Sequence, residues 1–379
     1  MKNLAIFYGG KSVEHDISII TAINLLSNVD KKKYNVFPVY IDKNNNWKIL
    51  KNYMNISSYI CQPSGVFLVT GFYNKYLVKK GAFGLKRLAK IDVAINCCHG
   101  AYGEDGSLSG LLKLAGIPLV GSGVLASSVG MDKAMMKDVF VANGIPCPKY
   151  YYFTEMDYNI HKYELMNKLE ADIEYPMIVK PSGLGSSIGI NISKNRQDLI
   201  NNVEIALKFD KKVIVESVIE NLREINCSVI GNYNEVRTSI LEEPKNWKTF
   251  LNFDEKYLNF DSSKKQIDVH INQQIDDQIR QLAIKCFKLL GCSGVVRIDF
   301  LYDEKNDKVY VNEINTVPGS LANYLWKDEY SFSQMVDLLV SLAEKEYQYM
   351  NECSYTYSSN VLDNFKDMKY ISKVNKFTK

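Results

Sequence analysis

The sequence lacks several features that would assign it to a specialised class of protein. No apolar run approaches the roughly 20 residues that a helix needs to cross a bilayer, so no membrane contact is expected. The short apolar stretch at the N-terminus runs straight into a Gly-Gly pair, which favours a first strand over a signal peptide. No basic stripe accompanies the net charge of +3, so nucleic acid is not expected as a partner.

Cysteine pairs with CxxC spacing are also absent, although the chain has eight cysteines. Without a secretory signal, these cysteines are expected to be reduced thiols that pack in the core of a cytoplasmic protein. The composition, 46% hydrophobic and 23% charged, is that of an ordinary globular protein. A chain of 379 residues is long enough for two or three domains.

The clearest chemical pattern lies in residues 294–319. They read GVVRIDFLYDEKNDKVYVNEINTVPG, two runs rich in β-branched and aromatic residues around a turn-forming DEKND, which predicts an antiparallel hairpin. Because side chains alternate along a strand, Arg297 and Asp299 share one face, as do Glu313 and Asn315. Carboxylate and amide oxygens suit Mg²⁺ beside phosphate oxygens, so a metal site is predicted here. The alternative is a hairpin with solvated polar residues.

Strands and helices alternate in the N-terminal third, which predicts a parallel sheet with its ligands at the strands' carboxyl ends. Strands are expected at residues 1–8, 36–41 and 91–96, and a helix at about 18–26. The Gly-rich loops at residues 9–10 and 99–106 lie at such strand ends. Residues 42–90 show no clear periodicity and are expected to be irregular.

Two further domains and a C-terminal tail are expected after residue 122. Helices are expected at residues 127–143, 274–290 and 332–347, strands at 176–180 and 213–216, and a long loop at 242–268. The expected domains are residues 1–122, 123–224 and 225–350, with a polar tail at 351–379.

A second group of candidate binding residues includes a Gly/Ser-rich loop and nearby charged residues. Lys180 precedes the sequence PSGLGSSIG, in which backbone N–H groups and two serine hydroxyls could hold an anion. The order of residues is not that of a P-loop, and such a turn can also be a flexible connection. Lys133 opens a helix, and Glu216 ends the strand VIVES, where it could accept from an adenine amine or a ribose hydroxyl, or cap a turn.

Taken together, these signals resemble the ATP-grasp ligases, and several blocks resemble the D-alanine–D-alanine ligase family. The matching blocks are GGKSVEHDIS, HGAYGEDGSLSGLLKLAGIPLVGSGVLASSVGMDKAMMK, MIVKPSGLGSSIG, GCSGVVRIDF and NEINTVPG. The resemblance implies an α/β chain with an ATP-grasp fold, preceded by a small Rossmann-like domain with a parallel sheet. It also implies ATP and two Mg²⁺ ions, with Mn²⁺ as an alternative, amino-acid substrates, and a homodimer.

The resemblance assigns roles residue by residue. ATP contacts are implied for Lys133, Lys180, Ser187, Glu216, Ile219 and Glu224, and metal contacts for Asp299, Glu313 and Asn315. Catalytic or positioning roles are implied for Glu14, Ser186, Tyr257, Arg297 and Gly319. Substrate contacts are implied for His99, Lys256, Ser320, Asn323 and Tyr324.

The implied reaction joins D-alanine to a second D-amino acid for peptidoglycan precursor synthesis. A carboxylate is a poor electrophile, so ATP first converts it to an acyl phosphate, which an amine then attacks. The acyl phosphate must be kept from water, and the long loop at residues 242–268 is the expected lid.

The sequence departs from the family where the acceptor should bind. Residues 320–326 read SLANYLW, with Tyr324 at the place of a serine that contacts the acceptor's carboxylate in the family. An altered acceptor site is therefore expected. The alternatives are a related ligase that uses D-serine, D-lactate or another small amine, and a nucleotide-binding protein without catalysis.

Overall fold

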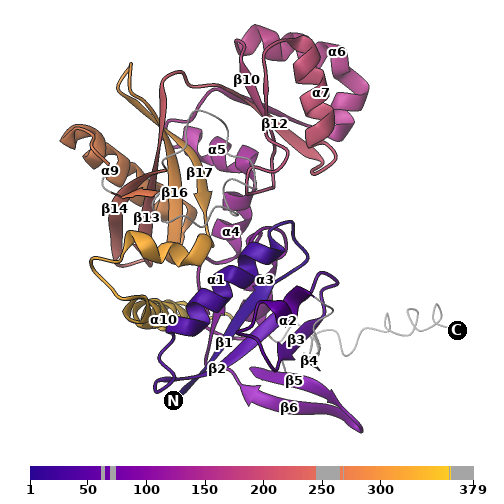
Figure 1. The fold of residues 1–379 in the computed structure, drawn as a ribbon, viewed down its shortest axis with the longest axis vertical. Helices are drawn as coiled ribbons and strands as arrows, with labels where there is room; N and C mark the ends of the chain where they lie inside the picture. The colour runs from indigo at the N-terminus through magenta and orange to yellow at the C-terminus, as the bar shows by residue number, and fades with distance from the viewer. Residues whose placement is uncertain (61–64, 69–73, 245–264, 268, 358, 360–379) are drawn as a thin grey trace, which may run out of the picture.

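The computed structural model describes residues 1–60, 65–68, 74–244, 265–267, 269–357 and 359. These residues form three sheets of eight, four and five strands. Figure 1 shows the N-terminal sheet in the lower lobe, the five-stranded sheet above it, and the four-stranded sheet in the uppermost lobe. The α/β composition agrees with the expected fold class.

The N-terminal sheet has the strand order β6-β5-β4-β3-β2-β1-β7-β8. Its strands are β1 Lys2–Gly9, β2 Tyr34–Ile41, β3 Trp47–Leu50, β4 Gly65–Leu68, β5 Tyr76–Gly81, β6 Gly84–Lys90, β7 Val93–Asn96 and β8 Leu119–Val120. β1 pairs in parallel with β2 and β7, as expected. The expectation that residues 42–90 are irregular was wrong, because β3 to β6 extend the sheet in antiparallel fashion. β6 is exposed along almost its whole length, so no buried face imposes an alternating pattern on its sequence.

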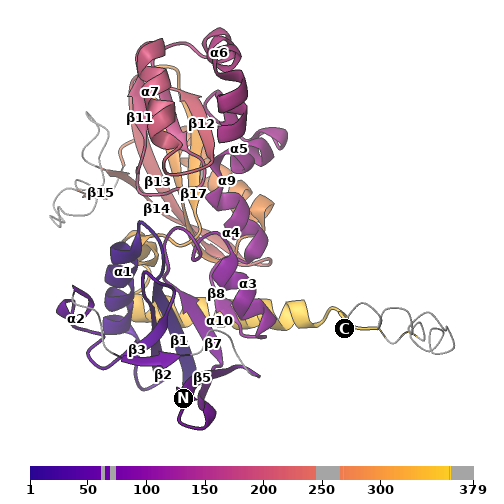
Figure 2. The same ribbon diagram turned by 90° about the vertical axis from the view of Figure 1, so that its right-hand side faces the viewer.

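Helices from both ends of the chain cover this sheet. They are α1 His15–Asn28, α2 Ser57–Ile60, α3 Ser107–Leu114 and α10 Phe332–Asn351. Leu4 and Ile6 of β1 share one hydrophobic core with Met335 and Leu339 of α10. Figure 2 shows α10 lying against the N-terminal lobe, far in sequence from the strands that it covers. The division of the chain into domains stays a prediction.

The four-stranded sheet is antiparallel, with the order β11-β10-β12-β9. Its strands are β9 Tyr150–Thr154, β10 Met177–Pro181, β11 Asn191–Ser193 and β12 Lys212–Ser217, and α6 Glu155–Asp172 and α7 Arg196–Ala206 cover one face (Figure 1). Ile178 faces Glu216 in the register, so Lys180, two residues further along β10, shares a face with Glu216.

The single helix expected at residues 127–143 is in fact two. α4 spans Val124–Met131 and α5 spans Lys133–Ala142. Asp132 between them is extended, and its side chain accepts from the N–H groups of Ala134 and Met135, each at 3.2 Å. This N-cap starts a new helix at Lys133, while the apolar spacing continues across the break.

The five-stranded sheet carries the expected hairpin. The strand order is β15-β14-β13-β16-β17, with bounds β13 Leu222–Gly231, β14 Val236–Pro244, β15 Lys265–Ile267, β16 Gly294–Asp303 and β17 Lys308–Asn315. The register pairs Arg297 with Asn315 and Asp299 with Glu313, which confirms the antiparallel hairpin. α9 Gln273–Leu290 packs against this sheet, and the 3₁₀ segment η2 Gly319–Leu325 follows β17. The loop expected from residue 242 begins after β14, and residues 245–264, most of the expected lid, lie outside the described residues.

Two smaller expectations can be compared with the structure. All described cysteines are free thiols, and all but Cys353 are at least partly buried. None of the helices in the described ranges is long and apolar enough to cross a membrane.

Candidate active site

Residues from all three lobes line one cleft. Eight of the residues singled out in the sequence lie in this lining. Its lining includes Glu14, His99, Lys133, Ser186, Arg297, Glu313, Asn315 and Gly319. The strand-end loops after β1 and β7 contribute Glu14 and His99, as expected for ligand-binding loops of a parallel sheet.

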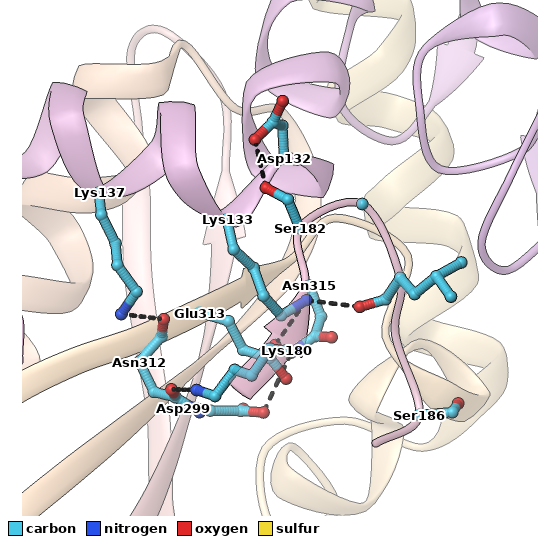
Figure 3. A network of polar contacts seen from close by, with 12 residues as sticks. Asp132, Lys133, Lys137, Lys180, Ser182, Ser186, Asp299, Asn312, Glu313 and Asn315 are labelled. Carbon is cyan, nitrogen blue, oxygen red and sulfur yellow. Dashed lines mark hydrogen bonds and ion pairs between the residues drawn. The ribbon is translucent and has the colours of Figure 1, made fainter. Parts of the chain in front are cut away.

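The hairpin brings a cation and carboxylates together. Arg297 Nε and Nη2 donate to the two carboxylate oxygens of Asp299 at 2.6 and 2.8 Å. Asn315 Nδ2 donates to Asp299 at 3.1 Å, and Lys133 Nζ lies 3.2 Å from the Glu313 carboxylate (Figure 3). Burial opposes the charge on Arg297, but Asp299 outweighs it and raises the pKa of Arg297 well above its usual value.

These residues fit a divalent cation. Asp299 and Glu313 face each other on neighbouring strands, and the amide oxygen of Asn315 is a third hard ligand. Within the described ranges no cluster combines three or more His, Cys, Asp or Glu side chains in metal-binding positions. The protein would therefore supply two carboxylates and an amide, and leave other positions to phosphate oxygens and water, which is the usual manner for Mg²⁺.

A second, deeply buried network lies beside the hairpin. Lys180 Nζ is 3.0 Å from Glu216 Oε2. It also lies 3.1 Å from Asn312 Oδ1 (Figure 3). Lys137 Nζ lies 3.5 Å from the same Glu216 oxygen and donates to the Asn312 carbonyl at 3.2 Å. Burial alone would raise the pKa of Glu216, but Lys137 and Lys180 together hold it below its usual value. Sequence reasoning missed Lys137 and Asn312; the i, i+4 spacing of Lys133 and Lys137 on one helix face was the available signal.

One oxygen of Glu216 remains available for a ligand. Its Oε1 is buried and has no hydrogen-bond partner among the described residues. A buried carboxylate oxygen of this kind suits an N–H or O–H donor, such as an adenine amine or a ribose hydroxyl. Ile219 lies half-buried in the turn after β12, and Glu224 is half-buried in β13.

The Gly/Ser-rich loop is tied to the helices around it. Lys133 donates to the Leu184 carbonyl at 2.6 Å, and Ser182 donates to Asp132 at 2.7 Å (Figure 3). Ser186 and Ser187 adopt left-handed φ values of +56° and +58°. Such successive turns direct backbone N–H groups into a concavity that accepts anions.

Ser186 also joins this loop to the N-terminal lobe, because its hydroxyl donates to the Glu14 carboxylate. A Cβ on Gly185 would lie 2.9 Å from Glu14 Oε2, so glycine is needed where the loop passes Glu14. The structure thus brings together Glu14 and Ser186, two residues with implied catalytic or positioning roles, while Tyr257 and Lys256 lie outside the described residues.

The residues expected to contact the acceptor lie on α1, η2 and the loop after β7. His99 Nε2 is 2.9 Å from Thr21 Oγ1, which accepts the N–H of Ser320 at 3.2 Å. Burial lowers the pKa of His99 to about 4, so the ring is neutral at pH 7. Tyr324 donates to Glu242 at 3.0 Å, and Asn323 is half-buried beside it.

Glu104 is a cleft residue that sequence reasoning missed. Its two oxygens accept the N–H groups of Val317 at 3.0 Å and Gly100 at 3.2 Å, which connects the loop after β7 to the turn after β17. Burial and, to a smaller extent, the Glu14 charge raise the pKa of Glu104 to about 7. Its place in the Gly-rich GEDG sequence was the signal that could have identified it.

Comparisons with known proteins place this cleft in a family. The family model of the D-ala D-ala ligase N-terminus matches residues 3–122, and that of the C-terminus matches residues 139–341. D-alanine--D-alanine ligase of Thermosipho melanesiensis is 39% identical over 383 residues, which cover 98% of this chain and 97% of that protein.

Two solved structures share the fold over almost the whole chain. The D-alanine-D-alanine ligase of Coxiella burnetii is 28% identical, with a TM-score of 0.78 over 93% of this chain and 98% of its own. The VanG D-Ala:D-Ser ligase of Enterococcus faecalis is 29% identical, with a TM-score of 0.77 over 90% of this chain and 99% of its own. The expected ATP-grasp fold with its N-terminal domain is thereby confirmed. The chain therefore belongs to the D-alanine–D-alanine ligase family.

Proposed function

We propose that the protein is an ATP-dependent ligase that joins D-alanine to a second D-amino acid during peptidoglycan precursor synthesis in the cytoplasm. The observation that carries this proposal is one cleft in which the Gly/Ser-rich loop, Arg297 and Glu313 meet, with Asp299 opposite Glu313 on the neighbouring strand. The family relationship supports the same reaction class. A homodimer is proposed from the family resemblance alone, and light scattering tests it.

In this account Lys133, Lys180 and the loop around Ser187 hold the phosphates of ATP, and Glu216 receives a donor from the adenosine. Glu14 and Ser186 position the first D-alanine, whose carboxylate oxygen attacks the γ-phosphorus to give an acyl phosphate and ADP. Asp299, Glu313 and Asn315 would hold Mg²⁺, which when bound neutralises negative charge on the phosphate oxygens.

The second half-reaction forms the amide. The acceptor's neutral amine attacks the acyl carbon, and the Arg297 guanidinium and the Gly319 N–H stabilise the negative oxygen of the tetrahedral intermediate. Collapse of the intermediate breaks the carbon–oxygen bond to phosphate. A protein that only bound nucleotide would have no use for Arg297 at this place, which speaks against a non-catalytic role.

The identity of the acceptor depends on the residues around Tyr324. The single hydroxyl proton of Tyr324 is donated to Glu242, so Tyr324 does not supply the donor that a serine would give to an acceptor carboxylate. This favours an altered acceptor site. D-serine or another small amine, or the hydroxy acid D-lactate, is the alternative to D-alanine.

Phosphate release from ATP tests the proposal directly. The protein is incubated with ATP, Mg²⁺ and D-alanine, alone or with D-serine, D-lactate and a panel of amines, and product masses are measured. We expect release that depends on D-alanine and a product heavier than D-alanine by one acceptor residue. ATP hydrolysis independent of every amino acid, without a ligation product, would refute the proposed function.

A further inference from the structure

A polar row crosses the five-stranded sheet beyond the candidate metal residues. The register pairs Glu242 with Asn226, Asn226 with Asp299, and Asp299 with Glu313. Directly paired residues on neighbouring antiparallel strands share a face, so all four side chains lie on the face that carries the hairpin's carboxylates. Glu242 ends this row on β14, two strands away from Asp299.

Glu242 is a buried carboxylate without a cation of its own. The residue is 2% exposed, and its Oε2 accepts from Asn226 Nδ2 at 3.2 Å and from the Tyr324 hydroxyl at 3.0 Å. No Lys, Arg or His among the described residues forms an ion pair with it, and the nearby Arg297 is engaged with both oxygens of Asp299. Taking a carboxylate out of water without a cationic partner costs several kcal/mol, on the order of the penalty for a single buried ion.

Two acceptor oxygens lie at this point of the row. Asn226 Oδ1 is buried and has no hydrogen-bond partner in the described part of the chain. Both hydrogen bonds that Glu242 accepts from described residues end on Oε2, which leaves Oε1 to a ligand. One negative charge beside a neutral amide oxygen suits a compact monovalent cation with several N–H donors, which is the description of a primary ammonium group.

We propose that Glu242 and Asn226 bind the ammonium group of the acceptor and that Glu242 takes up the proton that this group must lose. The inference rests on the proposed ligase function, which requires a neutral amine. Free amino acids carry an α-ammonium group at neutral pH, so a proton acceptor is needed before attack.

The step balances in protons and charge. The acceptor's ammonium gives one proton to the Glu242 carboxylate and becomes a neutral amine. The nitrogen lone pair forms the new bond to the acyl carbon, and phosphate leaves with the electrons of the broken carbon–oxygen bond. The amide nitrogen loses its second proton to the departing phosphate, and Glu242 returns its proton to water.

The surroundings support this place for the amine. The Glu242 carboxylate is one of the groups that raise the pKa of Arg297, so an ammonium at Glu242 is within electrostatic reach of the group that stabilises the oxyanion. Tyr324 acts as a positioning residue, since its hydroxyl holds the carboxylate in place from η2. Tyr324, the residue that departs from the family pattern, is therefore hydrogen-bonded to the proposed proton acceptor, Glu242.

The test compares an acceptor that must lose a proton before it attacks with a nucleophile that is already neutral. Hydroxylamine is largely unprotonated at neutral pH and converts an acyl phosphate to a hydroxamate without a base. Wild-type protein, Glu242→Gln and Glu243→Gln are each assayed for ligation product and for D-alanine hydroxamate. Glu243 is the matched control, because it is the next residue of β14 and pairs with Arg223 at 2.7 Å.

We expect Glu242→Gln to lose ligation by about 100-fold or more while hydroxamate formation stays within about threefold of wild type. Glu243→Gln should keep both activities, and Tyr324→Phe should lower ligation by less than Glu242→Gln does. Equal ligation by Glu242→Gln and wild type would overturn the inference, as would parallel loss of ligation and hydroxamate. Absence of both products with wild-type protein would instead refute the proposed ligase function.

Discussion

Lys137 Nζ lies 3.5 Å from Glu216 Oε2, and the two side chains are 0% and 1% exposed. This buried pair fixes one carboxylate oxygen and leaves the other, Oε1, without a partner among the described residues. The helix α5 thereby sets the position of a buried hydrogen-bond acceptor at the end of β12. Lys137 had no role implied by the sequence, whereas the family resemblance implies an ATP contact for Glu216.

Replacing Lys137 by Met should weaken nucleotide binding and the fold together. The change leaves Glu216 buried with Lys180 as its remaining cationic partner, and breaking a buried pair in this way destabilises a protein by about 3 kcal/mol. We expect a higher Kd for ATP and a lower unfolding midpoint in urea. The same substitution at the exposed Lys288 should change neither, and ATP binding by the Lys137 variant equal to that of wild type would contradict the role of the pair.

Glu313→Gln keeps the shape of the side chain and removes a charged oxygen ligand. If Glu313 holds catalytic metal, turnover should fall by about 100-fold or more at saturating Mg²⁺. Glu304→Gln, in the exposed turn of the same hairpin, is the control. Near-wild-type turnover of the Glu313 variant would remove this residue from the metal site.

Ser186→Ala removes the hydroxyl that donates to Glu14. A hydrogen bond to a charged group contributes about 1.5–3 kcal/mol, so the KM for the first D-alanine should rise by about tenfold or more. The KM for ATP should change much less. An unchanged KM for D-alanine would mean that the contact between loop and lobe does not position the donor substrate.

His99 should make stability depend on pH. Its pKa is lowered to about 4 in the fold, whereas a free histidine titrates near 6.5, so the unfolded chain binds more protons between these values. Stability is therefore fully present above about pH 6.5 and is lost as pH falls toward 4, by up to about 3 kcal/mol. Unfolding free energies at pH 7 and pH 5 measure this, and His99→Gln should flatten the difference. An equal difference in the variant would assign it to other groups.

Much of the fold and of the candidate site could be predicted from local patterns. The alternation in residues 294–319 is enough for a hairpin that carries Arg297 and Asp299 on one face, because strand geometry fixes it. The partners that complete the site could not be predicted in this way. Asn312 meets Lys180 and Lys137 through contacts between lobes, and Glu242 lies in a strand where the sequence favoured a loop.

The errors share a physical cause. The edge strand β6 has no buried face, so its sequence carries no alternation, and residues 42–90 looked irregular. The break at Asp132 depends on one side chain that caps α5, while the apolar spacing on both sides remained helical. In both places the hydrophobic pattern alone did not determine the structure.

Transfer of ¹⁸O from D-alanine to phosphate tests the central claim most directly. D-alanine labelled at both carboxylate oxygens is incubated with the protein, ATP, Mg²⁺ and an acceptor, and the released phosphate is analysed by mass spectrometry. Because the carboxylate oxygen that attacks the γ-phosphorus leaves with phosphate, we expect one ¹⁸O atom in each phosphate and one in the carbonyl group of the newly formed bond. Unlabelled phosphate would show that ATP is hydrolysed by water, and would contradict an acyl phosphate ligase.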